Sequence, residues 1–466
     1  MKITFCGAAQ TVTGSKHLIT TENGLKFLLD CGLFQGRGSD TFNLNNYWGF
    51  EPKDLDFVIL SHAHIDHSGL LPKLYKDGFR GKIYTTSATK DLCSVMLMDS
   101  AHIQEADLAF VNKRRLKRGE QAFEPLYSIE DAQNVLSLMR NVEYRNEFKI
   151  NQQVSLQFFD TGHILGSASI YLKIEENNEI KTLFFSGDIG RYGDKILKDP
   201  ENFPQTDYLI CESTYGNRLH ETHIGSENHL LTVIKETCVL QKGKVIIPAF
   251  SVDRTQEIIF ALNNMWNAGQ LPRIKVFVDS PLSVKATEIM RDHPECYNDD
   301  ILEIMKHDPE PFHFEGLTFI TKVEDSKQLN KLKEPCIIIS ASGMAEAGRI
   351  KHHIANNIEN ENNTILIVGY CTPESLGGRL RNGERIVKIF GEEFNVNARI
   401  EIMDSYSAHA DYNEMINYLS CQNPNEIKRL FLVHGEHETQ LEFKNRLIAQ
   451  GFRKIECPKQ FEEFEL

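Results

Sequence analysis

The stretch "FVILSHAHIDHSGLLPKLYKDG", Phe57–Gly78, decides the fold of this chain. A short apolar run is followed, within six residues, by the metal-capable side chains His62, His64, Asp66 and His67. Side chains alternate along an extended segment, so His62 and His64 point to one side, whereas the other two begin the turn into a helix. A polar loop without a metal is the alternative, but so many imidazoles are costly to hold together without a cation. The stretch therefore predicts a metal site.

Further metal-capable residues follow apolar runs elsewhere in the chain, namely Asp30, His163, Asp188, Glu212 and His434. Strand ends are where α/β folds place site residues, because the sheet holds them rigidly and the loops give access. A catalytic zinc takes about four ligands and keeps one position for water. The four residues of the first cluster cannot complete two such sites, and His163, Asp188 and His434 are candidates for the remaining positions. An aspartate can bridge two ions through its two oxygens.

Apolar, β-rich segments alternate with helical patterns almost from end to end, which is typical of α/β layering. The helices that we predict span residues 88–105, 226–240, 254–268, 345–358 and 436–450. With 466 residues, the chain is long enough for two or three domains.

Composition excludes some functions. The formal net charge of −14 argues against nucleic-acid binding by bulk positive charge, although a local basic surface remains compatible with it. No uninterrupted apolar run is long enough to span a membrane, and the N-terminus resembles a first strand more than a signal peptide. The ten cysteines are scattered without a C-x-x-C pair, which favours reduced thiols and a cytoplasmic location.

The motifs together resemble those of a known superfamily. "SHAHIDHSG" is similar to the H-x-H-x-D-H signature of the metallo-β-lactamase superfamily, and "LLDCG", "TGHILGSAS" and "FSGDIG" are similar to its other marks. "CESTYGNR", "DSYSAHADY" and "LVHGE" resemble motifs A, B and C of the β-CASP group, and place Glu212, His409 and His434. The resemblance covers nearly the whole chain. It is greatest to prokaryotic relatives of the nuclease subunit of the eukaryotic cleavage and polyadenylation specificity factor.

This resemblance implies an architecture that spacing alone does not give. The fold would be α/β, with an αββα metallo-β-lactamase sandwich and an inserted α/β β-CASP domain. The sandwich would be formed by residues 1–212 and 398–466, and the β-CASP domain by residues 213–397. The active site would lie in the cleft between the two domains.

The resemblance also implies a role for each site residue. One zinc ion would take His62, His64, His163 and Asp188, and a second would take Asp66, His67, Asp188 and His434, so that the chain holds two Zn²⁺. Asp30 would orient ligands by hydrogen bonds. A water held between the metals would attack phosphorus. His409, supported by Glu212, would protonate the leaving oxygen.

The implied substrate is single-stranded RNA, because RNA-processing members carry a histidine at motif C, here His434, where DNA-processing members typically carry valine. Candidate phosphate contacts are Arg254, Ser342, Gly343, Arg349 and Arg379, together with the backbone at Gly377–Gly378. Each of them could equally serve surface or interdomain pairing. A homodimer is a candidate assembly, and we expect no membrane partner.

The basic run Lys113–Gly119, in "NKRRLKRG", has no interleaved aromatic residues, and we interpret it as a solvated helix end or loop rather than an RNA patch. Alternative functions are a hydrolase of small-molecule esters or lactams, a DNA nuclease and a non-catalytic scaffold. The Glu212 and His409 pair argues against the first, and the unbroken ligand set against the last.

Overall fold

The computed structural model describes residues 1–36, 40–220, 226–369, 371–403 and 408–466. The chain divides into two compact units. Unit 1 comprises Met1–Leu219 and His409–Leu466, and unit 2 comprises His220–Ala408. The insertion of one α/β unit into another is therefore confirmed. Tyr370 and the first four residues of "DSYSAHADY", residues 404–407, lie outside the described part of the chain.

Unit 1 is built on two seven-stranded sheets. The first has the order β22-β1-β2-β3-β4-β5-β6, with strands Glu463–Glu465, Lys2–Gly7, Lys16–Thr20, Lys26–Leu29, Phe57–Ile59, Lys82–Thr85 and Met139–Asn141. The second has the order β21-β20-β11-β10-β9-β8-β7, with strands Ile455–Glu456, Arg429–Val433, Tyr208–Glu212, Glu179–Phe185, Ala168–Glu176, Val154–Asp160 and Phe148–Lys149. The last strand of the chain therefore pairs with the first.

The two sheets pack face to face through a common apolar core. Alternate residues of the strands point inward because the side-chain period of a strand is two. Phe27 and Leu29 of β3 thus meet Leu156 and Phe158 of β8 in a single cluster of buried side chains, which Phe431 of β20 also joins. This burial fixes the register of both sheets, since a slip by one residue would turn every apolar side chain outward.

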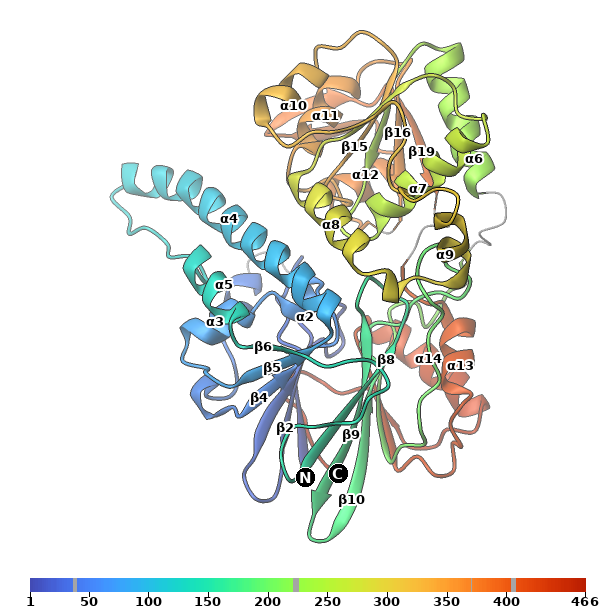
Figure 1. Cartoon of the computed structure of the whole chain (residues 1–466). Helices are drawn as coiled ribbons and strands as arrows, with labels where there is room; N and C mark the ends of the chain where they lie inside the picture. Colours follow the sequence, from blue (N-terminus) through green and yellow to red (C-terminus); the bar gives the residue numbers. More distant parts are fainter. Residues whose placement is uncertain (37–39, 221–225, 370, 404–407) are drawn as a thin grey trace. The chain divides into compact units, whose positions relative to one another are not determined.

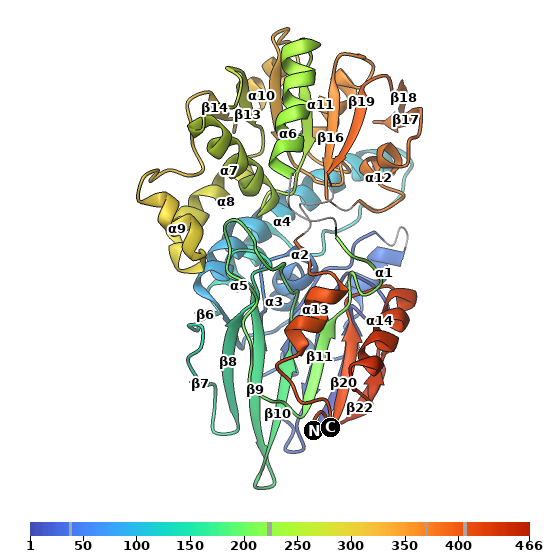
Figure 2. The same cartoon turned by 90° about the vertical axis from the view of Figure 1, so that its right-hand side faces the viewer.

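Helices cover the outer faces of unit 1 (Figure 1). Beside the first sheet lie α2, α3, α4 and α5, which span Ile65–Ser68, Leu71–Lys76, Ser87–Lys117 and Ile129–Leu136; the short α1, Asp40–Asn46, precedes them in the chain. The second sheet is covered by α13, Tyr412–Leu419, and α14, His437–Ala449 (Figure 2). A second core beneath them unites Phe184 and Leu209 of the strands with Tyr418 and Phe443 of these helices. The predicted αββα sandwich is confirmed.

Unit 2 contains one parallel sheet of order β14-β13-β15-β12-β16-β19. Its strands are Leu317–Phe319, Lys275–Val278, Cys336–Ser340, Val245–Pro248, Thr364–Val368 and Arg399–Met403, and a hairpin of β17, Ile386–Ile389, and β18, Glu392–Asn395, stands apart. Its helices α6 to α12 are Ser226–Ile234, Arg254–Asn267, Pro281–Asp292, Asp299–Met305, Val323–Leu329, Ile350–Asn357 and Leu376–Arg381. β19 belongs to this sheet although it follows residue 397, the predicted end of the inserted domain.

Three predicted helices differ from the observed ones in extent. The helix predicted for residues 226–240 is α-helical only as far as Ile234 and continues as a π-helix over Lys235–Leu240. The helix predicted for residues 88–105 is α4, which continues to Lys117, so the basic run forms its end. The helix predicted for residues 345–358 begins only at Ile350. Ala345 and Gly348 have φ values of 58° and 76°, in the left-handed region, which is incompatible with a right-handed helix. None of the described helices is both long and apolar enough to cross a membrane.

The segment that carries the histidine cluster is pinned to the end of β3 by close backbone contacts. The amide of Ser15 donates to the carbonyl of Asp66 at 2.8 Å, and the amide of Gly32 donates to the carbonyl of Ser15 at 2.8 Å. A Cβ atom at Gly32 would lie 1.6 Å from the Asp66 carbonyl oxygen, so only glycine fits here. Backbone packing thereby sets the position of α2 relative to the end of β3.

Candidate metal centre

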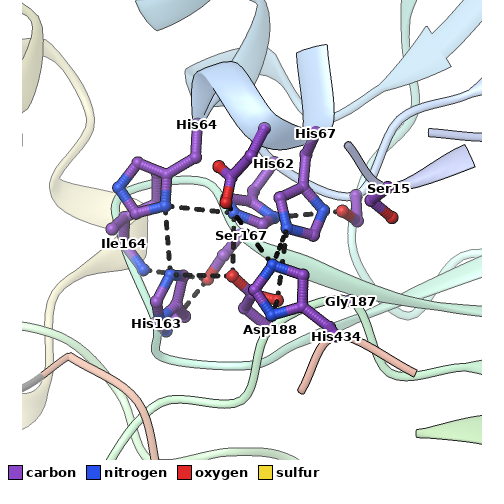
Figure 3. A network of polar contacts seen from close by, with 12 residues as sticks. Ser15, His62, His64, His67, His163, Ile164, Ser167, Gly187, Asp188 and His434 are labelled. Atoms are coloured by element: carbon purple, nitrogen blue, oxygen red, sulfur yellow. Dashed lines mark hydrogen bonds and ion pairs between the residues drawn. The ribbon is translucent and has the colours of Figure 1, made fainter. Parts of the chain in front are cut away.

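Strand ends of both sheets in unit 1 bring the cluster residues together (Figure 3). His62 and His64 lie on the loop after β4, and α2 begins one residue later with Asp66 and His67 in its only turn. The other three members follow strands of the second sheet: His163 comes after β8, Asp188 after β10 and His434 directly after β20. All seven residues predicted as ligands therefore converge.

The ligand atoms form a first group around one point. Nδ1 of His64 lies 3.2 Å from Nε2 of His62 and 3.2 Å from Nε2 of His163. Oδ2 of Asp188 lies 3.5 Å from Nε2 of His62 and 3.5 Å from Nε2 of His163. One ligand atom of each residue lies within 4.8 Å of the others, so these four residues can hold one ion.

A second group lies on the other side of Asp188. Nε2 of His67 is 3.2 Å from Nε2 of His434, which is 3.4 Å from Oδ2 of Asp66. Oδ1 of Asp188 is 3.3 Å from Nε2 of His67. The two oxygens of Asp188 thus face different groups, as a carboxylate that bridges two ions requires.

The donor atoms fit a pair of zinc ions. A tetrahedral zinc with bonds of about 2.0–2.1 Å places its ligand atoms about 3.3 Å apart, close to the observed separations. Oδ1 of Asp188 is buried and accepts no hydrogen bond within the described part of the chain, which is costly for a carboxylate oxygen unless a cation occupies the site. Imidazole and carboxylate ligands without thiolates are also a common zinc set.

Asp30 orients one of the histidines. Its Oδ2 accepts a hydrogen bond from Nδ1 of His67 at 2.6 Å, which leaves Nε2 of that ring to face the second group. Ser15 and Ser61 donate their hydroxyls to the same oxygen at 3.1 and 3.0 Å, and the Ser61 amide donates to Oδ1 at 2.8 Å. A buried carboxylate held by so many donors fixes the ring and its tautomer.

Other orienting residues were not predicted from the sequence. The Ser61 hydroxyl lies 3.0 Å from Nδ1 of His62, and the Thr214 hydroxyl lies 3.0 Å from Nδ1 of His434. The Ser167 hydroxyl accepts from the amide of His163 at 3.0 Å and shapes that loop. A hydroxyl next to a ligand in the chain, as at Ser61, is a recognisable signal, whereas the position of Thr214 depends on the pairing of β11 with β20.

Burial and mutual repulsion shape the protonation of the cluster. Burial, reinforced by His67, lowers the pKa of His62 well below its usual value, and burial lowers that of His64 to about 4. Burial opposes ionisation of Asp188 and Asp66, but the surrounding histidines prevail and hold both carboxyl pKa values low, that of Asp66 at about 2. Burial disfavours the charged form of His67, but Asp188 and then Asp30 outweigh it and raise the pKa of that ring well above its usual value. Neutral His62 and His64 beside ionised carboxylates are in the forms that bind metals.

A second pair of residues adjoins the first group. Glu212 ends β11, and its Oε1 lies 3.3 Å from Nδ1 of His409 and accepts from the amide of Ile189 at 2.6 Å. The His409 ring centroid is 4.6 Å from that of His163. Burial disfavours the charged imidazole, but Glu212 and then Asp188 outweigh it and raise the pKa of His409 to about 9. The contact with Glu212 therefore favours the protonated form of His409.

The five predicted phosphate contacts lie in unit 2, where most have partners. Arg254 is buried and paired with Glu257, and Arg379 pairs with Glu384 at 2.7 Å. Arg349 donates to Asp279 at 2.6 Å and to the carbonyl of Thr321 at 2.6 Å. The Ser342 hydroxyl accepts from the amide of Ala347 at 3.3 Å, and a Cβ atom at Gly343 would meet the ring of Phe250 at 2.6 Å.

Models of three protein families match the chain. The one described as "Metallo-beta-lactamase superfamily domain" matches residues 18–206. "Beta-Casp domain" matches residues 255–380, and "Zn-dependent metallo-hydrolase RNA specificity domain" matches residues 393–458. The first match contains six of the seven candidate ligands, and the third contains His434 and His409.

Several curated proteins are similar over almost the whole chain. Ribonuclease TTHA0252 of Thermus thermophilus is 33% identical over 451 residues, which are 97% of this chain and 97% of that protein. The RNase J-like protein of Methanocaldococcus jannaschii is 30% identical over 442 residues, 94% of this chain and 93% of that protein. The transcription termination factor FttA of Cenarchaeum symbiosum is 29% identical over 467 residues, 98% of this chain and 68% of that protein.

Replacing Asp30 by alanine should weaken metal retention, because His67 loses the acceptor that fixes its ring. We expect the affinity for zinc to fall by about 10- to 100-fold, as is typical when such a hydrogen-bond partner of a ligand is removed. Competition with a chromogenic chelator measures the zinc affinity of each variant. Asp54→Ala, which removes an exposed carboxylate, is the matched control. Equal zinc affinity in the two variants would contradict the role of Asp30.

Proposed function

Because the chain belongs to the β-CASP group of the metallo-β-lactamase superfamily, we propose that it is a zinc-dependent ribonuclease that hydrolyses phosphodiester bonds of single-stranded RNA. The observation that carries the proposal is the position of Asp188. Its two buried oxygens face two separate groups of ligand atoms, with His409 beside the first. A dinuclear metal pair and a proton donor together are suited to displacing an alkoxide from phosphorus.

In this proposal, His62, His64, His163 and Asp188 hold one zinc ion, and Asp66, His67, Asp188 and His434 hold the other. The two zinc ions would act as Lewis acids toward the phosphate. They would also lower the pKa of a bound water, which would serve as the nucleophile. Asp30, Ser61 and Thr214 keep the imidazole rings in the tautomers that face the ions.

His409 is the proton donor for the leaving oxygen. An imidazolium is needed before the bond breaks, and Glu212 stabilises the charged ring at 3.3 Å. Glu212 is itself held by the amides of Ile189 and Thr214, so that it cannot turn away from the histidine. After transfer, the neutral ring is reprotonated from solvent, since its side chain is about one-fifth exposed.

RNA is the substrate that three findings support. Motif C carries His434, the RNA specificity domain model matches residues 393–458, and relatives similar over nearly the whole chain are named as ribonuclease and as transcription termination factor. Arg254, Ser342, Gly343, Arg349 and Arg379 are proposed phosphate contacts, although Arg254 and Arg349 would first have to loosen their internal ion pairs. The ten cysteines are scattered without a C-x-x-C pair, which supports a reducing, cytoplasmic compartment. The homodimer stays a prediction.

The protein purified without chelator should carry about two zinc ions per chain, since seven ligands are too many for one tetrahedral ion. In Asp66→Ala, the zinc content should fall to about one ion, because the first group is untouched, and cleavage of RNA should be lost. Elemental analysis alongside circular dichroism separates metal loss from unfolding. Zinc at one ion or fewer in the wild-type protein would speak against the dinuclear centre.

Single-stranded RNA should be cleaved in preference to duplex DNA, lactams or thioesters. The substrates are to be compared side by side at one salt concentration, because phosphate contacts depend strongly on ionic strength. A 5′-labelled RNA reports the cutting mode as well as the activity. If a chromogenic lactam or thioester were turned over rapidly while RNA stayed intact, we would abandon the ribonuclease proposal.

Loss of the proton donor in His409→Ala should slow RNA cleavage by about 10²–10⁴-fold while the zinc content is unchanged. On bis-p-nitrophenyl phosphate the loss should be much smaller, because p-nitrophenolate leaves without a proton. His64→Ala, which removes a ligand, is the control that should lose zinc and both activities. Equal losses on the two substrates, or zinc loss in His409→Ala, would point to a structural or ligand role instead.

A further inference from the structure

The basic run at the end of α4 acquires aromatic neighbours through the fold. In the sequence no aromatic residue stands within the run, but the chain turns back after Gly119 and places Phe123 against the helix. The guanidinium carbon of Arg115 lies 3.8 Å from the centroid of the Phe123 ring. Phe42 of α1 adds a second ring, 6.1 Å from the first, centroid to centroid. We call Phe42, Lys113, Lys117, Arg118 and Phe123 the α4 platform.

The two aromatic rings of the platform are open to solvent. Phe42 is 55% exposed and Phe123 is 43% exposed, which is unusual for side chains that gain free energy from burial. Phe123 is nevertheless held in place, because Asn112 accepts from its amide at 2.8 Å and donates to its carbonyl at 2.9 Å. An exposed ring on a backbone held in this way offers its open face, the one not covered by Arg115, at little entropic cost on binding.

The positive charges of the platform are not neutralised. Lys113, Lys117 and Arg118 are exposed, and none of them makes an ion pair with another residue in the described ranges. Glu120, the acid nearest in the chain, is paired with Arg115 at 2.9 Å, which leaves Glu124 as the exposed acid of this turn. In a chain of net charge −14, this local surplus of cations favours a polyanion.

The platform is remote from the metal centre along its own helix. The hydroxyls of Thr86 and Thr89, at the beginning of α4, donate to the carbonyl of Gly166 at 2.7 and 2.8 Å, in the loop that carries His163. From there the helix extends past α5 (Figure 1) for 31 residues, about 45 Å at 1.5 Å per residue. A ligand of the platform is therefore distinct from the phosphate under attack.

We propose that the α4 platform binds single-stranded RNA upstream or downstream of the scissile bond, with bases stacked on Phe42 and Phe123 and phosphates bound by Lys113, Lys117 and Arg118. Aromatic faces with interspersed cations are the chemistry that binds single strands without sequence preference. The proposal rests on the ribonuclease function and adds to it a dependence on RNA length. Long unstructured substrates reach the platform, and dinucleotides do not.

The test compares two platform variants of the full-length protein with a matched control. Phe42→Ala with Phe123→Ala removes the stacking surface, and Lys113→Glu, Lys117→Glu and Arg118→Glu together reverse the charge. Lys149→Glu, Lys454→Glu and Lys459→Glu make the same charge change at exposed positions elsewhere in unit 1. Cleavage of a long unstructured RNA, a dinucleotide and bis-p-nitrophenyl phosphate is measured for each, with zinc content and circular dichroism.

Both platform variants should raise KM for the long RNA by about 5- to 100-fold at unchanged kcat, with dinucleotide and ester turnover as in the wild type. The charge variant should also reduce the slope of log KM against log salt by about 2, because three phosphate contacts to a single strand contribute about 0.7 each. The aromatic variant should keep the slope. The control should match the wild type.

Three outcomes would overturn the proposal. The platform variants could cleave the long RNA with the same kinetics as the control, or they could lose as much activity on the dinucleotide as on the long RNA. The aromatic variant could also lose self-association while its cleavage of RNA is unchanged. The last, detected by analytical ultracentrifugation, would assign the rings to contact with a second copy. If the wild-type protein leaves RNA intact, the ribonuclease proposal fails. Fluorescence anisotropy with the same RNA then still decides whether the platform binds it.

Discussion

The carboxylate of Asp188 is the constraint on which the site depends. The other six candidate ligands, five imidazoles and the Asp66 carboxylate, lie around it in two groups, and its two oxygens face opposite groups. Histidines packed so closely repel one another once protonated, and burial lowers the pKa values of His62 and His64 accordingly. Only cations between the groups satisfy all the lone pairs at once, including the orphaned Oδ1 of Asp188. The site thus has the donor arrangement of a metal centre, in which the ligand atoms of two groups converge on two points.

The sandwich fold holds these donor residues in place. One sheet contributes the loop after β4 and the other contributes the ends of β8, β10 and β20, so that the donors approach from two rigid walls. The common core between the sheets fixes their separation. Asp30 and Gly32 at the end of β3 then clamp α2 from behind, through the ring of His67 and the carbonyl of Asp66. Core packing and these backbone contacts therefore hold the donors in place, which is what catalytic preorganisation requires.

The two ends of α4 link the chemistry to the proposed RNA contacts. Its first turn supports the loop of His163, and its last turn carries the cations of the α4 platform. A long helix is rigid, so it can present binding groups far from the metal centre without disturbing it. The charge of the chain as a whole is of the wrong sign for RNA, and specificity for a polyanion must therefore come from local surfaces. Catalysis and substrate retention are in this way assigned to separate parts of one unit.

The sequence by itself determined what depends on near neighbours in the chain. H-x-H-x-D-H places two pairs of donors because the backbone period is fixed, and an apolar run followed by a polar residue marks a strand end wherever it occurs. The α/β class, the ligand candidates and the pair of Glu212 and His409 followed from such local patterns and from the family resemblance they carry. Only the tertiary structure decided which distant groups meet: Thr214 with His434, Asp279 with Arg349, and Phe42 with Phe123 beside Arg115. Those contacts depend on sheet pairing and loop closure. Both result from many weak interactions along the whole chain, so no short stretch of sequence predicts them.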